Sequence, residues 1–363
     1  ICGLGVIFAV SMSEPVNCRP GIAIWGFKAK AIFIDHAIPY HCLTSKDMPY
    51  IQPSYPLDYP LFLAWLYFCM GEANDYLIKL IPPMLACMVC ITMYCLMKAE
   101  GVKPWLCAIM TLLFASGQQF YSCSIQLYAE NLLLLHVLLG CYFIYLTIEV
   151  KAGRDAAWLG GLLLASGAWA KNEGLLYLII AGILTIWLLW RRKTGERNSS
   201  ADVAVGGIED NRATPCMVIL GLLLPALLFV APWRILLASL DILPGDFHLS
   251  WDALDESNKL AVTAKMINTT FYQALIGLPG TQAGIWIILP AICILRWRRL
   301  WNDRGIQFLL CVALGVMCCY YVSFYFSTRE LYWHLLAAYR IILVPTALAL
   351  LAIGCLVARN KSE

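Results

Sequence analysis

Charged residues are scarce in this sequence. Asp, Glu, Lys and Arg make up 13% of the 363 residues, whereas about a quarter is usual for a soluble globular domain. Hydrophobic residues account for 61%, and the mean hydropathy is +0.72. The composition therefore excludes an ordinary soluble domain and predicts an integral membrane protein. The net charge of +3 is uninformative by itself, and we expect no nucleic-acid partner.

Metal-binding patterns and internal repeats are also missing. Paired CxxC motifs with zinc spacing do not occur, and the five His residues are scattered. The sequence thus predicts no cofactor, although it leaves a divalent metal open. Without a repeat or a low-complexity run, we interpret residues 1–363 as a single membrane domain. The lack of an inverted repeat also disfavours a secondary transporter.

The sequence starts at Ile1 inside an apolar run, with neither Met nor a basic flank. The run from Ile1 to Met12 is too short to span a bilayer. We interpret it as the tail of a first transmembrane helix rather than a signal peptide. We therefore expect upstream residues to be missing from this sequence.

Long apolar segments recur through the rest of the chain, and each is expected to form a transmembrane helix. Together with the partial first helix they predict an all-α polytopic membrane protein with about ten spans. The expected spans are 75–97, 105–117, 127–149, 157–171, 174–190, 216–233, 284–295, 306–326 and 335–357.

The distribution of Lys and Arg predicts the orientation. Most of the 26 basic residues lie in short alternate connections, which the positive-inside rule assigns to the cytoplasm. The loops 13–74 and 234–283 are then expected to face outward. The connection 194–214 is polar and rich in Gly and Ser, and is expected to be a flexible cytoplasmic loop.

The first outer loop contains a polar and aromatic stretch, residues 20–60. Within it, the segment from Ala23 to Phe33 has the pattern of a short helix lying in the membrane interface. An ordinary loop helix packed on the bundle is the alternative. The short apolar run from Leu61 to Met70 is expected either to enter the interface or to pack on the bundle. The apolar face of the first helix is predicted to hold Ile24, Phe27, Ala31 and Ile32, with Lys28 and Lys30 off that face. Cys18 and Cys42 share this loop and could form a disulfide.

Several ionisable residues map to the outer ends of the expected spans, where charges are costly and often functional. Glu130 opens one span, Lys171 and Glu173 occupy a tight turn, and Arg340 lies inside the last span below His334. Structural interpretations remain open for each. Glu130 could cap its helix, Lys171 and Glu173 could simply pair, Arg340 could extend to the interface, and His334 could be an ordinary interfacial residue. Their common side nevertheless predicts a site.

Five short motifs occur in a fixed order along the chain. They are AIWGFKAKAIF, YPLDYPLFLAW, Tyr128-Ala129-Glu130, Lys171-Asn172-Glu173-Gly174, and Trp333-His334 followed by Arg340. This ordered set resembles the C-type superfamily of polytopic membrane glycosyltransferases, in the branch of protein O-mannosyltransferases and aminoarabinose transferases.

The resemblance implies transfer of a sugar from a polyprenyl-phosphate donor to an acceptor at the outer face. A carboxylate would take the acceptor's proton, and fixed positive charge would hold the leaving phosphate. One carboxylate is enough for inverting transfer of a hexose or pentose. The acceptor could be a lipid, a glycan or a protein, and the location a bacterial inner (plasma) membrane with the site facing the periplasm or exterior. The expected substrate-binding residues are Arg340, Lys171, Glu173, His334, Trp25, Lys28, Tyr59 and Tyr128, and Tyr55 and Trp333 could also stack on sugar rings.

One departure from the family's pattern concerns the base. The family keeps an Asp just upstream of the IW…KAK stretch, where this chain has Arg19-Pro20-Gly21. A non-catalytic lipid-binding member of the same fold therefore stays as an alternative. A flippase or transporter of lipid-linked sugars is a separate alternative. The acids that could replace the missing Asp are Glu130, Asp58, Asp35 and Glu14, with Glu130 preferred and Asp58 next.

Overall fold

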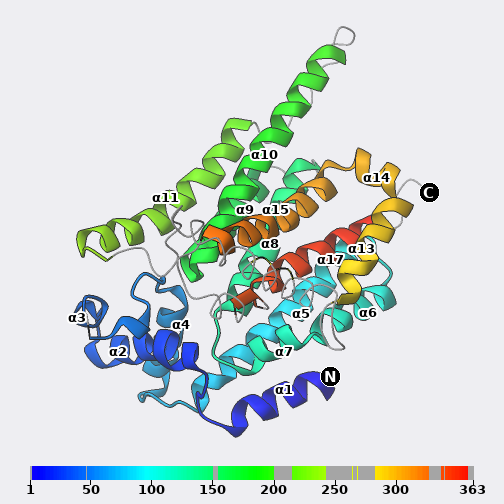
Figure 1. The fold of residues 1–363 in the computed structure, drawn as a ribbon. Helices are drawn as coiled ribbons and strands as arrows, with labels where there is room; N and C mark the ends of the chain where they lie inside the picture. Colours follow the sequence, from blue (N-terminus) through cyan, green and yellow to red (C-terminus); the bar gives the residue numbers. More distant parts are fainter. Residues whose placement is uncertain are drawn as a thin grey trace.

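The computed structural model of the chain describes residues 2–45, 47–149, 154–199, 215–242, 264, 268, 283–326, 337–338 and 340–358. Every regular element within these ranges is helical (Figure 1). The predicted all-α class is therefore confirmed, with the elements arranged as a bundle of long helices and a set of short helices at one end.

Short helices form most of the N-terminal part. Their bounds are α1 Cys2–Ser13, η1 Gly21–Gly26, α2 Phe27–Asp35, α3 Tyr40–Leu43, η2 Pro49–Ile51, α4 Asp58–Met70 and η3 Leu77–Leu80. Longer helices then follow. They are α5 Ile81–Ala99, α6 Pro104–Ala115, α7 Gln118–Ile125, α8 Glu130–Ile148, α9 Arg154–Ala170, α10 Asn172–Ser199, α11 Pro215–Ser239, α13 Ala283–Leu295, α14 Trp297–Asn302, α15 Arg304–Phe326 and α17 Leu343–Val357.

The centre of the bundle is formed by α8 and α17. Both are apolar on every side, and nearly all residues of α17 are buried. A helix that is hydrophobic all round either lies among other helices or faces lipid. Accordingly α8 contacts α5, α9, α10, α15 and α17, while α11 lies at the outside with many exposed leucines.

Five helical segments are long and apolar enough to cross a membrane by length and composition. They are Leu77–Ala99, Glu130–Ile148, Asn172–Arg191, Cys216–Ser239 and Arg304–Phe324. Shorter apolar helices run over Gly3–Ser13, Pro104–Ala115, Ile285–Leu295 and Leu343–Val357. The described parts of the predicted spans are thus mostly helical, while their total of about ten stays a prediction. Two loop boundaries were wrong, because α10 continues to Ser199, into the predicted loop 194–214, and α11 continues to Ser239, into the predicted loop 234–283.

The first loop contains the expected short helices. The segment from Ala23 to Phe33 is helical across η1 and α2, and the run to Met70 is the end of α4. One detail of the expected helical face was wrong, because Lys28 is buried together with Ala29 and Ile32. The cause is a pair of hydrogen bonds from its ammonium group, described with the site below.

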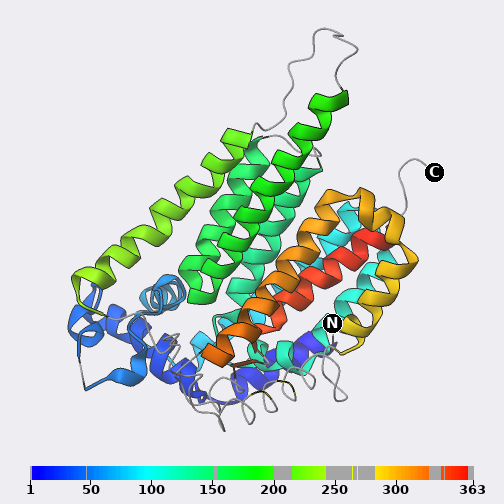
Figure 2. The ribbon, with the colours of Figure 1, turned by 45° about the horizontal axis from the view of Figure 1, so that its top comes forward.

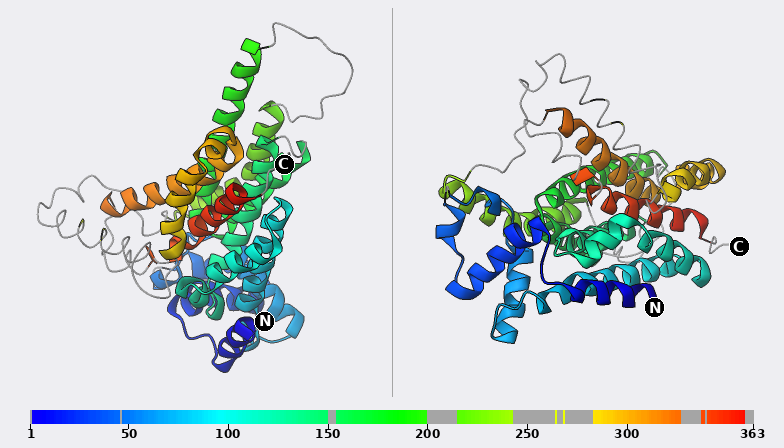
Figure 3. Two further views of the ribbon diagram at one scale, coloured as in Figure 1. Left: turned by 90° about the vertical axis from the view of Figure 1, so that its right-hand side faces the viewer. Right: turned by 60° about the horizontal axis from the view of Figure 1, so that its bottom comes forward.

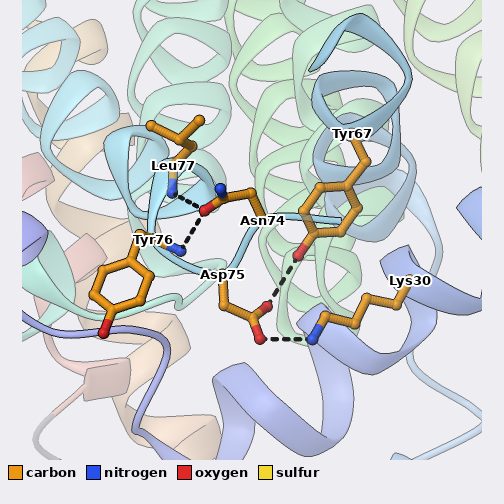
Figure 4. Close-up of polar contacts among 6 residues, drawn as sticks. All are labelled: Lys30, Tyr67, Asn74, Asp75, Tyr76 and Leu77. Atoms are coloured by element: carbon orange, nitrogen blue, oxygen red, sulfur yellow. Dashed lines mark hydrogen bonds and ion pairs between the residues drawn. The ribbon is translucent and has the colours of Figure 1, made fainter. Parts of the chain in front are cut away.

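An exposed polar contact ties this loop to the bundle (Figure 4). Lys30 on α2 pairs with Asp75 at 2.6 Å, and the Tyr67 hydroxyl donates to the other carboxylate oxygen at 3.4 Å. The Asn74 side chain accepts the backbone N–H groups of Tyr76 and Leu77 and so shapes the start of η3. Helices α2 and α4 are therefore fixed to the segment that leads into α5.

The two Cys of this loop, Cys18 and Cys42, are free thiols, so the disulfide left open by the sequence is not formed.

The short N-terminal helices lie at one end of the bundle, and the far end of α10 lies at the other (Figures 2 and 3). The C-terminal end of α11 meets the N-terminal loop, since Trp233 and Leu237 pack against Leu43 and Leu57. The predicted outer loop 13–74 and the start of 234–283 therefore share one end, as the basic-residue pattern requires. The described part of 234–283 that continues from α11 is 234–242.

The orientation can be tested by labelling with a membrane-impermeant thiol reagent in intact cells. In a Cys-free background, Glu72→Cys should react and Lys103→Cys should react only after permeabilisation, because both positions are exposed but lie in connections assigned to opposite sides. Labelling of Lys103→Cys but not Glu72→Cys in intact cells would invert the proposed topology.

Candidate active site

A tight turn between α9 and α10 places Lys171 at the end of the bundle. Helix α9 ends at Ala170 and α10 begins at Asn172, so Lys171 is the single residue between them. Its backbone N–H donates to Gly167 at 3.1 Å, and the Gly174 N–H donates to the Lys171 carbonyl at 2.9 Å. A Cβ at Gly174 would collide with the Gly167 backbone. Glycine is therefore needed for a turn this close.

Glu130 is the first residue of α8. The helix N-terminus carries a partial positive charge, which favours a carboxylate at this position. The next residue, Asn131, donates its side-chain amide to the Cys123 carbonyl at 3.2 Å and to the Ser124 hydroxyl at 3.3 Å. These bonds fix the end of α7 against the start of α8, and so they fix the position of Glu130.

Glu130, Lys171, Glu173 and Arg340 form one ion cluster, although they come from three separate parts of the chain. Glu130 Oε1 lies 3.2 Å from Lys171 Nζ and 3.0 Å from Arg340 Nη1. Lys171 Nζ also pairs with Glu173 Oε1 at 2.9 Å. The side chains of Glu130 and Lys171 are 3% and 6% exposed, whereas that of Arg340 is 26% exposed. Arg340 is thus the cation of the cluster that an incoming ligand can reach most easily.

Aromatic rings border this cluster. The Arg340 guanidinium lies over the Tyr128 ring, 4.8 Å from its centroid, which is a cation–π arrangement. Tyr55 approaches from the first loop. Burial raises the pKa of its phenol, and the charges of Glu173, Lys171 and Arg340 also act on it. The 52–55 turn therefore lies beside the ion cluster.

Two carboxylate oxygens of the cluster have no hydrogen-bond partner. Glu130 Oε2 and Glu173 Oε2 are both buried and unpaired within the described part of the chain. A buried acceptor without a partner is costly, and such atoms often mark where a ligand or water binds. The carboxylates are thus anchored through one oxygen each, and the second oxygen is available.

Lys28 holds the 52–55 turn in place. Its ammonium group is buried and donates to the carbonyls of Gln52 at 2.8 Å and Tyr55 at 3.0 Å. Gln52 has a φ of 50°, a left-handed conformation that costs a non-glycine residue about 1 kcal/mol. Burial lowers the pKa of Lys28 to about 7. A neutral amine keeps two N–H groups, which match these two carbonyls. The predicted contact of Lys28 with substrate stays a prediction, whereas its contact with the turn is direct.

The remaining acids proposed as the base lie outside the cluster. Asp58 is half-buried at the start of α4, and burial raises its pKa to about 6. Asp35 is exposed near His41, with 3.6 Å between the ionisable groups. Glu14 is exposed and accepts a hydrogen bond from Asn17. No described contact joins any of the three to Lys171 or Arg340.

The predicted aromatic contacts are only partly brought together. Trp25 and Tyr59 are buried and pack edge to face, 5.7 Å between ring centroids, and Trp25 also meets Tyr55 at 5.5 Å. The Tyr59 hydroxyl is buried without a partner in the described structure. Stacking on a sugar stays a prediction for these rings. His334 and Trp333 lie outside the described residues.

Three residues at this end were not singled out from the sequence. Arg234 Nη2 donates to Asn172 Oδ1 at 3.2 Å, and the Trp233 indole donates to the Ser54 carbonyl at 3.4 Å. Asn172 also approaches the Ser54 carbonyl at 3.5 Å. The signal was present in the sequence, because Arg234 is the one charged residue in the apolar stretch of α11. Among the residues that the structure describes, no group of three or more His, Cys, Asp or Glu could hold a metal.

The burial of Lys28 predicts a pH dependence of stability. The pKa of Lys28 is about 7 in the folded protein, compared with the ordinary value of 10.5. Between these two pH values the unfolded chain therefore binds more protons than the folded protein does. The free energy of unfolding should therefore rise with pH in this window. We expect the melting temperature of the parent in detergent to increase from pH 7 to pH 9 relative to that of Lys28→Met.

Lys30→Met is the matched control, because Lys30 lies two residues away on α2 but is exposed and paired with Asp75. Its pH dependence should parallel that of the parent. If the melting temperatures of the parent and of Lys28→Met changed equally between pH 7 and pH 9, the ammonium of Lys28 would not be destabilised by burial.

Comparisons with known proteins agree with this fold. The family model described as dolichyl-phosphate-mannose-protein mannosyltransferase matches residues 61–240. A search of curated proteins gave no match. Among solved structures, ArnT from Cupriavidus metallidurans bound to undecaprenyl phosphate is similar, with a TM-score of 0.59 and 12% sequence identity.

That similarity covers 99% of this chain and 59% of the ArnT chain, so this sequence corresponds to a little over half of the relative's length. The family model covers the start of α8, the α9–α10 turn and α11, which carry Glu130, Lys171 and Arg234. The apolar helices and these two matches indicate an integral membrane protein. Together, the two matches support the assignment of this chain to the C-type superfamily of polytopic membrane glycosyltransferases.

Proposed function

We propose that the protein transfers a sugar from a polyprenyl-phosphate donor to an acceptor hydroxyl at the outer face of the membrane. The observation that carries this proposal is the ion cluster. It combines one carboxylate with an unpaired buried oxygen, Glu130 Oε2, and two cations on the other oxygen of the same group. A carboxylate and fixed positive charge are the two elements that this transfer requires.

The reaction needs one bond to form while another breaks. The acceptor oxygen attacks the anomeric carbon of the donor, and the bond from that carbon to the phosphate oxygen breaks with inversion. The phosphate leaves with the electron pair, so it needs cations rather than a proton. Arg340 and Lys171 supply this charge, and Glu130 Oε2 takes the proton of the acceptor hydroxyl. The sugar is a hexose or a pentose, and the acceptor is a lipid, a glycan or a protein.

Donor binding would also prepare the base. In the free protein, Arg340 and Lys171 both stabilise the ionised Glu130. A phosphate that binds these cations competes for their charge, and a carboxylate that loses part of its stabilisation accepts a proton more readily. Arg340, at 26% exposure, is where this competition can begin. The donor and the base are therefore coupled through the same two cations.

The similar ArnT structure contains undecaprenyl phosphate, and this supports a polyprenyl-phosphate donor here. By the same analogy we propose a bacterial inner membrane, with the site on the periplasmic or exterior side. A flippase would need polar groups that continue through the membrane, whereas the described cluster lies at one end of the bundle. A non-catalytic lipid-binding protein is the second candidate, because Arg19-Pro20-Gly21 replaces the family's Asp.

The role of the base can be tested by amide substitutions. Glu130→Gln should abolish sugar transfer from a labelled polyprenyl-phosphate donor, since an amide accepts no proton. It should also lower the melting temperature, because two cations lose a buried anionic partner. Asp58→Asn is the comparison, since burial raises the pKa of Asp58 to about 6, which suits a base near neutral pH.

The same assay with Asp35→Asn and Glu14→Gln provides exposed controls, which should transfer like the parent. Loss of transfer in Asp58→Asn, with Glu130→Gln active, would assign the base to Asp58. If all four amide variants transferred sugar like the parent, the carboxylate mechanism would be wrong. A parent that is inert with every donor would favour the non-catalytic candidate, and Pro20→Asp would then be the variant to assay.

Donor binding tests the role of Arg340. Arg340→Ala should weaken polyprenyl-phosphate binding by roughly ten- to over a hundredfold, since a charge-assisted contact contributes about 1.5–3 kcal/mol. Arg340→Lys should keep part of the affinity, because it retains the charge but not the planar fork of donors. Unchanged affinity in a folded Arg340→Ala protein would reduce Arg340 to a membrane-interface anchor.

A further inference from the structure

Arg234 carries its charge within an apolar helix, where a charge is unfavourable. It is the one charged residue of the membrane-spanning segment Cys216–Ser239, and its side chain is half-buried. A charged side chain in such a helix is costly and usually has a specific partner. The only polar contact of Arg234 in the described structure is the one its Nη2 donates to Asn172 Oδ1, at 3.2 Å. A guanidinium has five N–H donors, so most of its capacity is unused.

The position of Arg234 joins it to the ion cluster. Its partner Asn172 lies between Lys171 and Glu173, which are both members of the cluster. The neighbouring Trp233 bonds to the Ser54 carbonyl in the 52–55 turn, and that turn borders the cluster through Tyr55. Arg234 is therefore at the same end of the bundle as the cluster and approaches it from α11.

Within the group formed by the ion cluster and Arg234, the charges do not cancel. Lys171 and Arg340 are offset by Glu130 and Glu173. Arg234 has no carboxylate within ion-pair distance in the part of the chain that the structure describes. Three cations thus accompany two carboxylates in this group of described residues, and an excess positive charge in a poorly solvated place attracts an anion strongly. Arg presents its donors in a planar fork that matches a phosphate group.

We propose that Arg234 is a second anion-binding residue of this site and takes a phosphate oxyanion through the free edge of its guanidinium. The inference rests on the proposed function in one respect, since the phosphate-bearing donor is the expected source of the anion. Asn172 acts as a positioning residue, because its side-chain oxygen holds the guanidinium beside the cluster. Arg340 and Arg234 would then approach the phosphate region from the α17 and α11 sides respectively.

The test is binding of polyprenyl phosphate to the full-length protein in detergent. Arg234→Gln should weaken binding by at least about tenfold, and Arg234→Lys by less, since it keeps the charge. Arg298→Gln is the matched control, because Arg298 is exposed on α14, away from α11 (Figure 1), and it should bind like the parent. Parallel titrations with inorganic phosphate show the source of the anion, as only a site for free phosphate would bind it without the lipid.

Parent-like affinity of Arg234→Gln for both polyprenyl phosphate and inorganic phosphate would overturn the inference. If Arg234→Gln does not fold, Arg234→Lys decides. A loss of affinity with an unchanged melting temperature of the free protein supports the inference, and parent-like affinity contradicts it. Sugar transfer separates the two proposals. A parent that binds phosphate through Arg234 but transfers no sugar overturns the proposed function alone, whereas active transfer with unchanged phosphate affinity in Arg234→Gln overturns the inference alone.

Discussion

The polar end of this bundle depends on one carboxylate, that of Glu130. Its Oε1 atom is shared by Lys171 and Arg340, which lie 41 and 210 residues further along the chain. The start of α8, the α9–α10 turn and the segment before α17 must therefore meet at one point. Breaking a buried ion pair by removing one partner is strongly destabilising. Any ligand of Lys171 or Arg340 thus alters both the local structure and the state of the carboxylate.

The rest of the structure supplies the surroundings in which this contact is strong. Apolar packing of α8 and α17 forms a scaffold without charged groups at its centre. The first loop then covers the polar end, with the 52–55 turn bound by Lys28 on one side and by Trp233 on the other. Electrostatic contacts gain strength where water is excluded. A site that must stabilise a leaving phosphate benefits from such a position, because its charges are already arranged before the reaction.

Composition and periodicity were sufficient to predict the helical membrane class, and the ordered motifs were sufficient to predict the superfamily. The positions of Glu130, Lys171, Glu173 and Arg340 near the ends of the predicted spans also indicated that these residues share a site, because charges there are costly and tend to be kept for a function. The buried position of Lys28 could not be predicted, since its partners are backbone carbonyls in a turn 24 and 27 residues away. Arg234 could have been noticed as the one charged residue of an apolar helix, but its contact with Asn172 could not be predicted, because it depends on how α11 packs against α10.

An experimental structure of the protein with polyprenyl phosphate would test the central claim most directly. The phosphate oxygens should lie within hydrogen-bond distance of Arg340 and Lys171, with Glu130 Oε2 facing the vacant acceptor side. The contact between Arg340 and Glu130, 3.0 Å in the free protein, should lengthen as the phosphate takes its place. A phosphate bound elsewhere, with the ion cluster unchanged, would contradict this account.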